Sequence, residues 1–267
     1  MTRVVVLGAS GFIGRSVART LRARGDDVVT MPTLGALEDH RELEGVRADA
    51  CVHLAEPAVL ADPRDGDANQ VRARRVLACG FRRVVYVSSA VVYGDREASV
   101  RDEQAALAPR GLYAEAKVAV EAIVARNDRT AIARLGNAYG PGMSAHNVLS
   151  DILAQLGGDG PLVVRDLEPV RDYVHVDDIA RAIAALVHSP ARGPINIGTG
   201  VGSSVRRLAE LACAAADQPG RAMHASAPNP ARSSLVLSID RSRKELGWSP
   251  TITLERGIEQ LVREKLA

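Results

Sequence analysis

The 267-residue sequence is poor in cysteine, in aromatic residues and in long apolar runs. Its three cysteines, Cys51, Cys79 and Cys213, form no C-x-x-C pair, and an odd number argues against a disulfide framework. Cys51 lies in an apolar run and Cys213 in an alanine-rich stretch, so we expect buried thiols, which fit a reducing cytoplasm. Since no run reaches the roughly 18 apolar residues of a membrane span, we expect no membrane segment.

The sequence also lacks an excess of charge of one sign. Its 34 basic and 32 acidic residues leave a formal net charge of +2. The densest basic groups flank apolar segments and have no aromatic residues between them, which predicts solvated faces and no nucleic-acid partner. A hydrophobic content of 46% is ordinary for a globular protein, and the length allows one large domain or one domain with a lobe.

What the sequence does contain is a glycine-rich stretch close to its start. An apolar run, Val4–Leu7, ends at Gly8. Gly11 and Gly14 follow at three-residue steps, and residues 15–24 have the pattern of a helix. The free N–H groups of a helix start suit a pyrophosphate, and glycines let the backbone approach it. The spacing is G-x-x-G-x-x-G rather than G-x-G-x-x-G, so by itself it also fits a turn in another α/β protein.

Short apolar runs and helical patterns then alternate along the chain. We predict strands at residues 28–31, 50–55, 84–89 and 130–135 and helices at residues 68–79 and 112–126. This alternation predicts a parallel sheet with helices on both faces, in which ligands lie at the carboxyl ends of the strands. Ser88, Ser89 and Asn137 come at strand ends, so we expect them to face the ligand cleft.

The pattern changes beyond Asn137. Strands are predicted at residues 171–176 and 195–198, helices at 146–155, 203–216, 238–246 and 254–266, and loops at 57–67 and 219–234. A helix after residue 176 is expected to be capped by Asp177 or Asp178.

Tyr113 and Lys117 stand four residues apart in one predicted helix and therefore project from the same face. A free phenol has a pKa of ~10, and a nearby ammonium favours its phenolate form. Such a tyrosine can exchange a proton with an alcohol or a carbonyl oxygen, and Ser89 can hydrogen-bond the same oxygen. An isolated match is as well explained by a surface tyrosine packed on a lysine stem, but the glycine turn and the strand ending in two serines favour a site.

With these motifs in order, the sequence resembles the extended short-chain dehydrogenase/reductase superfamily, in its NAD-dependent epimerase/dehydratase branch. The matching segments are residues 8–14, 53–55, 87–94, 113–117, 134–142, 171–178, 196–200 and 245–248. The resemblance implies a doubly wound parallel sheet (Rossmann fold) with a small C-terminal substrate-binding lobe. The dinucleotide-binding domain would comprise residues 1–140 with about 172–200, and the lobe about 141–171 and 201–267.

The resemblance also implies roles for single residues. Tyr113 would be the catalytic acid/base, Lys117 its electrostatic partner, and Ser89 the catalytic hydroxyl and a substrate contact. The residues implied to bind the cofactor are Gly8, Ser10, Gly11, Phe12, Ile13, Gly14, Leu54, Ala55, Ser88, Tyr113 and Lys117. Substrate contacts would be Asn137, Arg171 at a diphosphate, and Arg232 as a second phosphate ligand. Either arginine is also compatible with a surface ion pair, and no metal site is expected.

The sequence departs from the family pattern in three places. Pro32 stands where an acid usually bonds the adenosine ribose, so NAD and NADP both stay open, with NADP slightly favoured. Glu56 puts a carboxylate beside the expected pyrophosphate, which is unfavourable unless it turns away. Ala90 and Val91 replace the Asp-Glu pair of the family's 4,6-dehydratases, which makes dehydration the less favoured reaction.

The sequence therefore predicts a cytoplasmic NAD(P)-dependent oxidoreductase that acts on a nucleoside-diphosphate sugar, as an epimerase or a keto-sugar reductase. A homodimer is a further expectation from the family. Two alternatives stay open: an NADPH-dependent ketoreductase of a non-nucleotide small molecule, and a non-catalytic NAD(P)-binding sensor or scaffold.

Overall fold

The computed structural model describes residues 1–31, 43, 45–56, 62–231 and 233–266. Within them a six-stranded parallel sheet has the spatial order β2-β1-β3-β4-β5-β9. In that order the strands are β2 (Asp27–Met31), β1 (Arg3–Leu7), β3 (Ala50–His53), β4 (Arg83–Ser89), β5 (Thr130–Leu135) and β9 (Gly193–Ile197). The order turns from β1 toward β2 on one side and toward β3 on the other, which creates the switch point where α/β sheets bind ligands.

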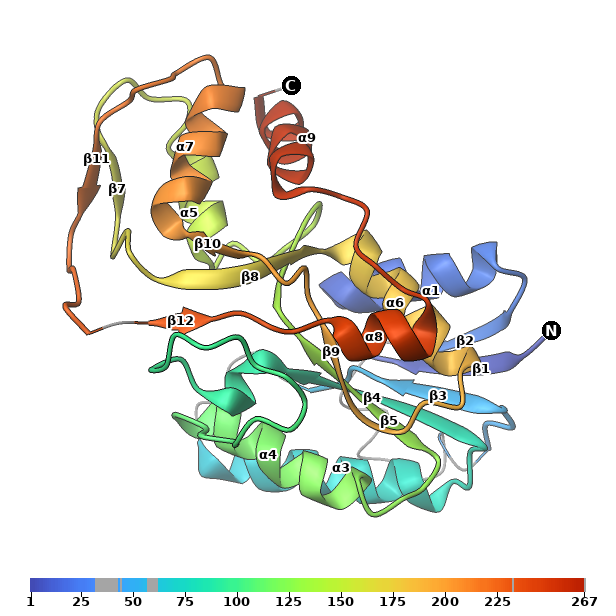
Figure 1. Cartoon of the computed structure of the whole chain (residues 1–267). Coiled ribbons are helices and arrows are strands. Elements are labelled where there is room, and N and C mark those ends of the chain that lie inside the picture. The colour runs from blue at the N-terminus through green and yellow to red at the C-terminus, as the bar shows by residue number, and fades with distance from the viewer. Residues whose placement is uncertain (32–42, 44, 57–61, 232, 267) are drawn as a thin grey trace.

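Helices cover both faces of the sheet (Figure 1). One face carries α1 (Phe12–Ala23) and α6 (Val176–His188), which pack on each other, and the other carries α3 (Pro63–Ala78) and α4 (Leu112–Val124). The predicted doubly wound Rossmann fold is confirmed.

The strands form because their side chains are buried on both faces, as parallel sheets require. In β1, Val4 and Val6 belong to the apolar cluster under α1 and α6. Val5 and Leu7 point to the opposite face and join the cluster that contains Val76 of α3. The unbroken apolar run in the sequence therefore serves two cores at once.

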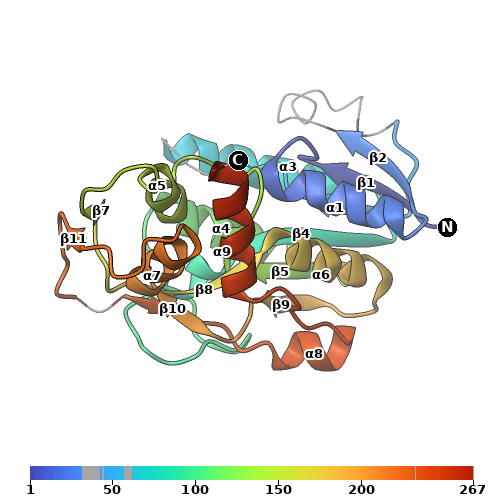
Figure 2. The same cartoon turned by 90° about the horizontal axis from the view of Figure 1, so that it is seen from above.

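The carboxyl half of the chain adds a lobe beside the sheet (Figure 2). Its strands are β6 (Asn137–Tyr139), β7 (Leu162–Val164), β8 (Val170–His175), β10 (Gly202–Ser204), β11 (Met223–Ala225) and β12 (Ser234–Leu235). Strand β8 pairs with β6, β10 and β12, while β7 pairs with β11. The helices α5 (Val148–Ala154), α7 (Val205–Ala215) and α9 (Leu254–Leu266) enclose a separate apolar cluster. A short helix, α8 (Asp240–Leu246), lies against β9 and α6.

Several local predictions were wrong for identifiable reasons. Helix α3 begins at Pro63, inside the predicted loop, because Asp62 and Asp65 form a capping box and proline is tolerated in the first turn. The stretch predicted as a loop at residues 219–234 contains β11 and the start of β12.

The cap of α6 was also predicted wrongly. His175 is the N-cap, and its ring nitrogen Nδ1 accepts a hydrogen bond from the Asp177 amide at 3.2 Å. Asp178 instead points inward, is completely buried, and accepts hydrogen bonds from the amides of Thr251 and Ile252 at 3.1 and 3.0 Å. The first turn of α6 thereby anchors the segment that leads into α9.

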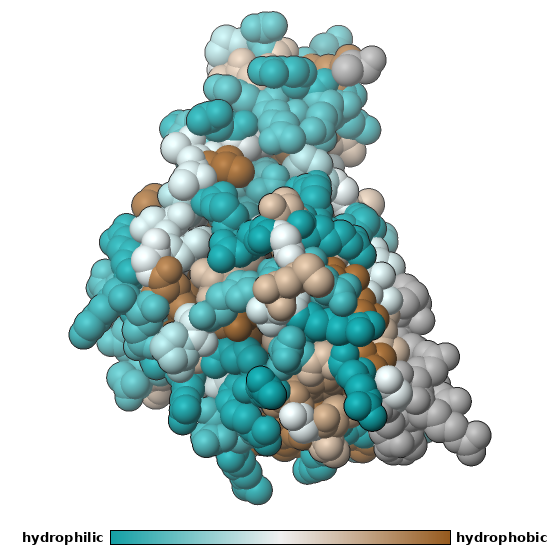
Figure 3. Space-filling view, turned by 90° about the vertical axis from the view of Figure 1, so that its right-hand side faces the viewer, coloured by the Kyte–Doolittle hydropathy of each residue, from teal (hydrophilic) through white to brown (hydrophobic). Residues whose placement is uncertain are grey.

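Two of the three cysteines are buried, and one face of the molecule is largely hydrophilic. Cys51 and Cys213 are buried as predicted. The face on the right-hand side of Figure 1 is largely hydrophilic, with small apolar areas between polar side chains (Figure 3). In the described part of the chain, the helices are all too short or too polar to cross a membrane.

Candidate functional site

The glycine-rich turn connects β1 to α1 and brings three backbone segments together. Gly8 has a φ of +82°, which favours glycine, and a Cβ at this position would lie 2.9 Å from the carbonyl carbon of Leu54. At Gly14 a Cβ would lie only 2.1 Å from the Gly8 oxygen. Gly11 is the N-cap of α1 and provides no side-chain cap, so the first N–H groups of the helix stay available to an anion. This geometry fits a pyrophosphate.

A cleft of about 410 Å³ opens at the carboxyl ends of the strands, next to this turn. The predicted site residues that line it are Gly8, Gly11, Phe12, Ile13, Gly14, Leu54, Ser88, Ser89, Tyr113, Lys117 and Asn137. Ser88 adds a second sign of a ligand, because its buried hydroxyl has no hydrogen-bond partner among the described residues. Motifs that are up to 129 positions apart in the sequence, from Gly8 to Asn137, therefore share one cleft.

The remaining predicted residues lie elsewhere. Ser10 is exposed in the glycine turn, and Ala55 is buried. Arg171 donates a hydrogen bond to Asp95 at 2.9 Å and another to Ser233 at 2.8 Å. It therefore forms an ion pair, which was the alternative to a diphosphate contact. Arg232 and Pro32 fall outside the described residues.

Tyr113 and Lys117 lie on α4 with both side chains at the cleft. The ammonium nitrogen of Lys117 is 5.7 Å from the centre of the Tyr113 ring and 5.1 Å from the centre of the Tyr86 ring. Lys117 is buried and donates a hydrogen bond to the carbonyl oxygen of Val87 at 2.9 Å. The helix thus places a phenol and a fixed positive charge at one edge of the cleft.

Glu56 takes a position that sequence reasoning raised only as a conflict. Glu56 lines the cleft, but its side chain is only 3% exposed, and its Oε2 atom lies 2.5 Å from the Lys117 ammonium and 3.0 Å from the Tyr86 hydroxyl. Burial alone would raise the pKa of Glu56, but the Lys117 ammonium holds it below its usual value. Burial likewise opposes a charge on Lys117, yet Glu56 raises the pKa of the ammonium above its ordinary value. Both groups are therefore charged at neutral pH.

Other cleft residues were missed. Val87, Leu135, Gly136, Ala138 and Ser144 also line the cleft. Leu135, Gly136 and Ala138 stand at or shortly after the end of β5, and Val87 lies two residues before the end of β4, so the rule that located Ser88 and Asn137 could have located them too. Ser144 follows a glycine-proline-glycine break and carries no such signal.

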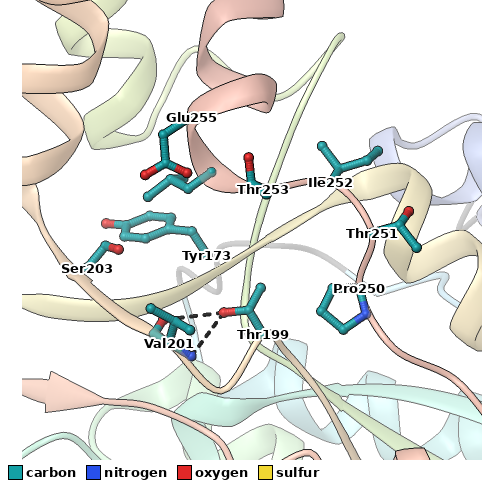
Figure 4. Close-up of a pocket in the computed structure, with 10 residues that line it drawn as sticks. Tyr173, Thr199, Val201, Ser203, Pro250, Thr251, Ile252, Thr253 and Glu255 are labelled. Carbon is teal, nitrogen blue, oxygen red and sulfur yellow. Dashed lines mark hydrogen bonds between the residues drawn. The ribbon is translucent and has the colours of Figure 1, made fainter.

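A second pocket, of about 330 Å³, lies between β8, β10 and the segment before α9 (Figure 4). Its lining includes the hydroxyl groups of Tyr173, Thr199 and Ser203, and Glu255 stands at its upper edge in the figure. Thr199 forms hydrogen bonds with the backbone of Val201, drawn as dashed lines in Figure 4. Its hydroxyl also donates a hydrogen bond to Asp172. The residues predicted to carry chemistry do not line this pocket, so the first cleft is the candidate active site.

Comparisons with known proteins identify the family of the chain. The family model of the NAD dependent epimerase/dehydratase family matches residues 4–198, and the chain belongs to this family. A UDP-glucose 4-epimerase from Mycolicibacterium smegmatis is 31% identical over 97% of each chain. A dTDP-6-deoxy-L-talose 4-dehydrogenase (NAD(P)(+)) from Kitasatospora kifunensis is 27% identical over 97% of this chain and 94% of its own. The structure of a Thermus thermophilus UDP-glucose 4-epimerase in complex with NAD superposes with a TM-score of 0.87, at 26% identity and 99% coverage of both chains.

Proposed function

We propose that this chain is an NAD(P)-dependent oxidoreductase that acts on a nucleotide-activated sugar, as an epimerase or as a keto-sugar reductase. The observation that carries the proposal is that Tyr113 and Lys117 line the same cleft as the glycine turn. The named relatives support the substrate class, since both are enzymes of nucleoside-diphosphate sugars by their names. The particular reaction and the choice between NAD and NADP are parts of the proposal.

Different residues of the cleft would bind the dinucleotide and move the proton. Gly8, Gly11 and Gly14 would hold the pyrophosphate of the dinucleotide at the start of α1, and the unpaired Ser88 hydroxyl would bind the same molecule. When bound, the nicotinamide dinucleotide supplies or accepts a hydride.

The proton is moved by the protein. Tyr113 would take a proton from the substrate hydroxyl at its phenolic oxygen, or return it to a carbonyl oxygen. Lys117, whose ammonium nitrogen lies 5.7 Å from the centre of the Tyr113 ring, would be its charged partner. Ser89 lines the same cleft and would hydrogen-bond the reacting oxygen.

Dehydration is the less favoured reaction for this cleft. A 4,6-dehydratase needs an acid and a base directly after the catalytic hydroxyl, but Ala90 and Val91 stand there and neither can exchange a proton. The fold itself does not decide the question, because dTDP-glucose 4,6-dehydratases share it. The proposal therefore rests on the two residues.

A substrate without a nucleotide is the second candidate for this cleft. Arg171 is already neutralised by Asp95, at 2.9 Å, which favours a ketoreductase of a non-nucleotide small molecule over a diphosphate held by this arginine. The two candidates are separated by thermal shift with UDP and dTDP, because a ligand of the folded state raises the melting temperature. A sensor or scaffold is disfavoured because Ser89, Tyr113 and Lys117 are all present in one cleft.

The Tyr113→Phe variant tests the proposed function. With UDP- and dTDP-hexoses and either dinucleotide, its turnover is expected to fall at least ~100-fold because the proton carrier is gone, while dinucleotide binding measured by NAD(P)H fluorescence stays unchanged. Tyr173→Phe is the matched control, since Tyr173 lines the second pocket and should keep the wild-type rate. A Tyr113→Phe enzyme with a near-normal rate refutes the assignment.

A further inference from the structure

Arg15 is an exposed cation at the edge of the glycine turn, one position after Gly14. Its guanidinium donates a hydrogen bond to the carbonyl oxygen of Ser10 at 2.7 Å and another to that of Gly142 at 3.4 Å. Because the Ser10 carbonyl is covalently bonded to the Gly11 nitrogen, one guanidinium nitrogen lies within about 5 Å of that nitrogen, in the residue that caps α1. The charge of Arg15 is therefore held beside the turn where a pyrophosphate is expected.

In the part of the chain that the structure describes, the cleft itself offers no uncompensated cation to a pyrophosphate. The charged side chains of its lining are Lys117 and Glu56, which pair with each other at 2.5 Å. The first turn of α1 contains no acidic residue, so no carboxylate there opposes an anion at the start of the helix. A pyrophosphate nevertheless carries more negative charge than a helix end, worth about half an elementary charge, can balance.

Arg15 differs from Arg19, one helical turn further along α1, in having no carboxylate partner among the described residues. Arg19 pairs with Asp177 at 2.5 Å. The hydrogen bonds of Arg15 go to carbonyl oxygens, which leave its charge uncompensated and most of its N–H groups available. A guanidinium in this state suits a phosphate, whose oxygens it can bind through two parallel hydrogen bonds.

Arg15 also lines a small pocket, of about 220 Å³, that adjoins the cleft. Phe12, in the first turn of α1, belongs to the lining of both. The carboxylate of Glu264 lines the small pocket too, but in the described structure it accepts a hydrogen bond from a neighbouring amide on α9 and forms no ion pair with Arg15. The guanidinium therefore lies at the boundary of the cleft, where its side chain can turn toward the phosphates of a bound ligand.

We propose that Arg15 is a cofactor-binding residue that contacts the pyrophosphate of the dinucleotide. This inference rests on the proposed function, because it concerns the cofactor of the same cleft. The glycine turn lets the pyrophosphate approach the N–H groups of α1, and Arg15 supplies a positive charge that the paired Lys117 does not. Since NAD and NADP share the pyrophosphate, Arg15 strengthens the binding of both and does not select between them.

The test is a measurement of dinucleotide affinity, which needs no substrate. Dissociation constants of NADH and NADPH are measured by the fluorescence of the reduced nicotinamide. Arg15→Gln removes the charge and keeps most of the length of the side chain, so both constants are expected to rise about tenfold through the loss of one charge-assisted contact. Arg19→Gln is the matched control, because Arg19 is already neutralised by Asp177 and its loss should leave both constants unchanged.

Two further measurements separate the charge of Arg15 from a purely structural role. Arg15→Lys keeps the charge and is expected to retain the wild-type affinity to within about threefold. Raising NaCl from about 0.05 M to about 1 M screens an exposed charge, so the difference in affinity between Arg15→Gln and the wild type should narrow. A difference that is the same at both salt concentrations reports a distorted turn and overturns the inference.

The outcome is separable from the fate of the proposed function. If the wild type binds neither dinucleotide, the proposed function fails and the inference fails with it. If the wild type binds a dinucleotide and Arg15→Gln binds it equally well, the proposed function stands and the inference alone is overturned. A loss of affinity for NADPH without a loss for NADH assigns Arg15 to the additional phosphate of NADPH, which also overturns the inference.

Discussion

His53 makes the stability of this fold depend on pH in a range where most side chains do not titrate. It ends β3 opposite Tyr86 of β4, with ring centres 5.7 Å apart, and its side chain is 1% exposed. Neither ring nitrogen has a hydrogen-bond partner among the described residues. Burial, assisted by Lys117 and Arg72 and opposed by Glu56, lowers the pKa of His53 to about 4. The folded protein therefore holds this ring neutral.

The sign and size of the effect follow from the difference between the two states. In the unfolded chain the histidine has a pKa of about 6.5, so on acidification the unfolded state takes up a proton that the folded state refuses. Stability is lost as the pH falls from 6.5 toward 4, and between pH 7 and pH 5 the loss attributable to this one ring is about 2 kcal/mol. Above pH 7 His53 contributes no pH dependence.

Equilibrium unfolding in urea measures this loss, with the fluorescence of Trp248, the single tryptophan, as the signal. His53→Leu removes the titrating ring, so its unfolding free energy should fall by about 2 kcal/mol less than that of the wild type between pH 7 and pH 5. His146→Leu, at an exposed position, is the matched control and should retain the wild-type dependence. If His53→Leu and the wild type lose the same free energy over this interval, the neutral buried ring is not the cause.

Two further variants test the turn and the anchor of the lobe. Gly14→Ala is expected to abolish dinucleotide binding in calorimetry, because its Cβ would lie 2.1 Å from the Gly8 oxygen, whereas Gly157→Ala, with no atom within 4 Å of the new Cβ, should bind normally. An unchanged Kd for Gly14→Ala contradicts the close packing of this turn. Asp178→Ala should lower the free energy of unfolding by about 3 kcal/mol because it leaves buried amides unpaired, while the exposed Asp240→Ala should cost less than about 0.5 kcal/mol. Equal losses in the two variants would show that the anchor is unimportant.

The sheet could be predicted from the sequence because its strands are short apolar runs that are visible in the sequence itself. Val4–Leu7 and Ala50–His53 are short apolar runs buried on both faces, and each is followed by residues that face the cleft. The glycine spacing predicted the turn for a steric reason that the structure confirms, since a side chain at Gly14 would overlap the Gly8 carbonyl oxygen. Signals of this kind are local, so a single sequence contains them.

The lobe could not be predicted in the same detail because its contacts are not local. Strand β12 is two residues long, and it pairs with β8 at a separation of 64 positions, between Ser234 and Val170. His175 is the N-cap of α6, whereas Asp178 accepts hydrogen bonds from the amides of Thr251 and Ile252. Neither choice leaves a pattern in the neighbouring sequence.

Contacts between residues far apart in the sequence also decide the position of Glu56 in the candidate active site. Its position beside the expected pyrophosphate predicted a conflict, because only the residues next to it along the chain could be considered. In the structure Glu56 is paired with Tyr86, 30 positions away, and with Lys117, 61 positions away. A carboxylate buried alone would be strongly destabilising, so Glu56 requires a buried cation, and the cation that reaches it is the proposed partner of Tyr113. Lys117 is therefore buried in the core and also lines the cleft. Its proposed role beside Tyr113 depends on Glu56, the carboxylate with which it is paired.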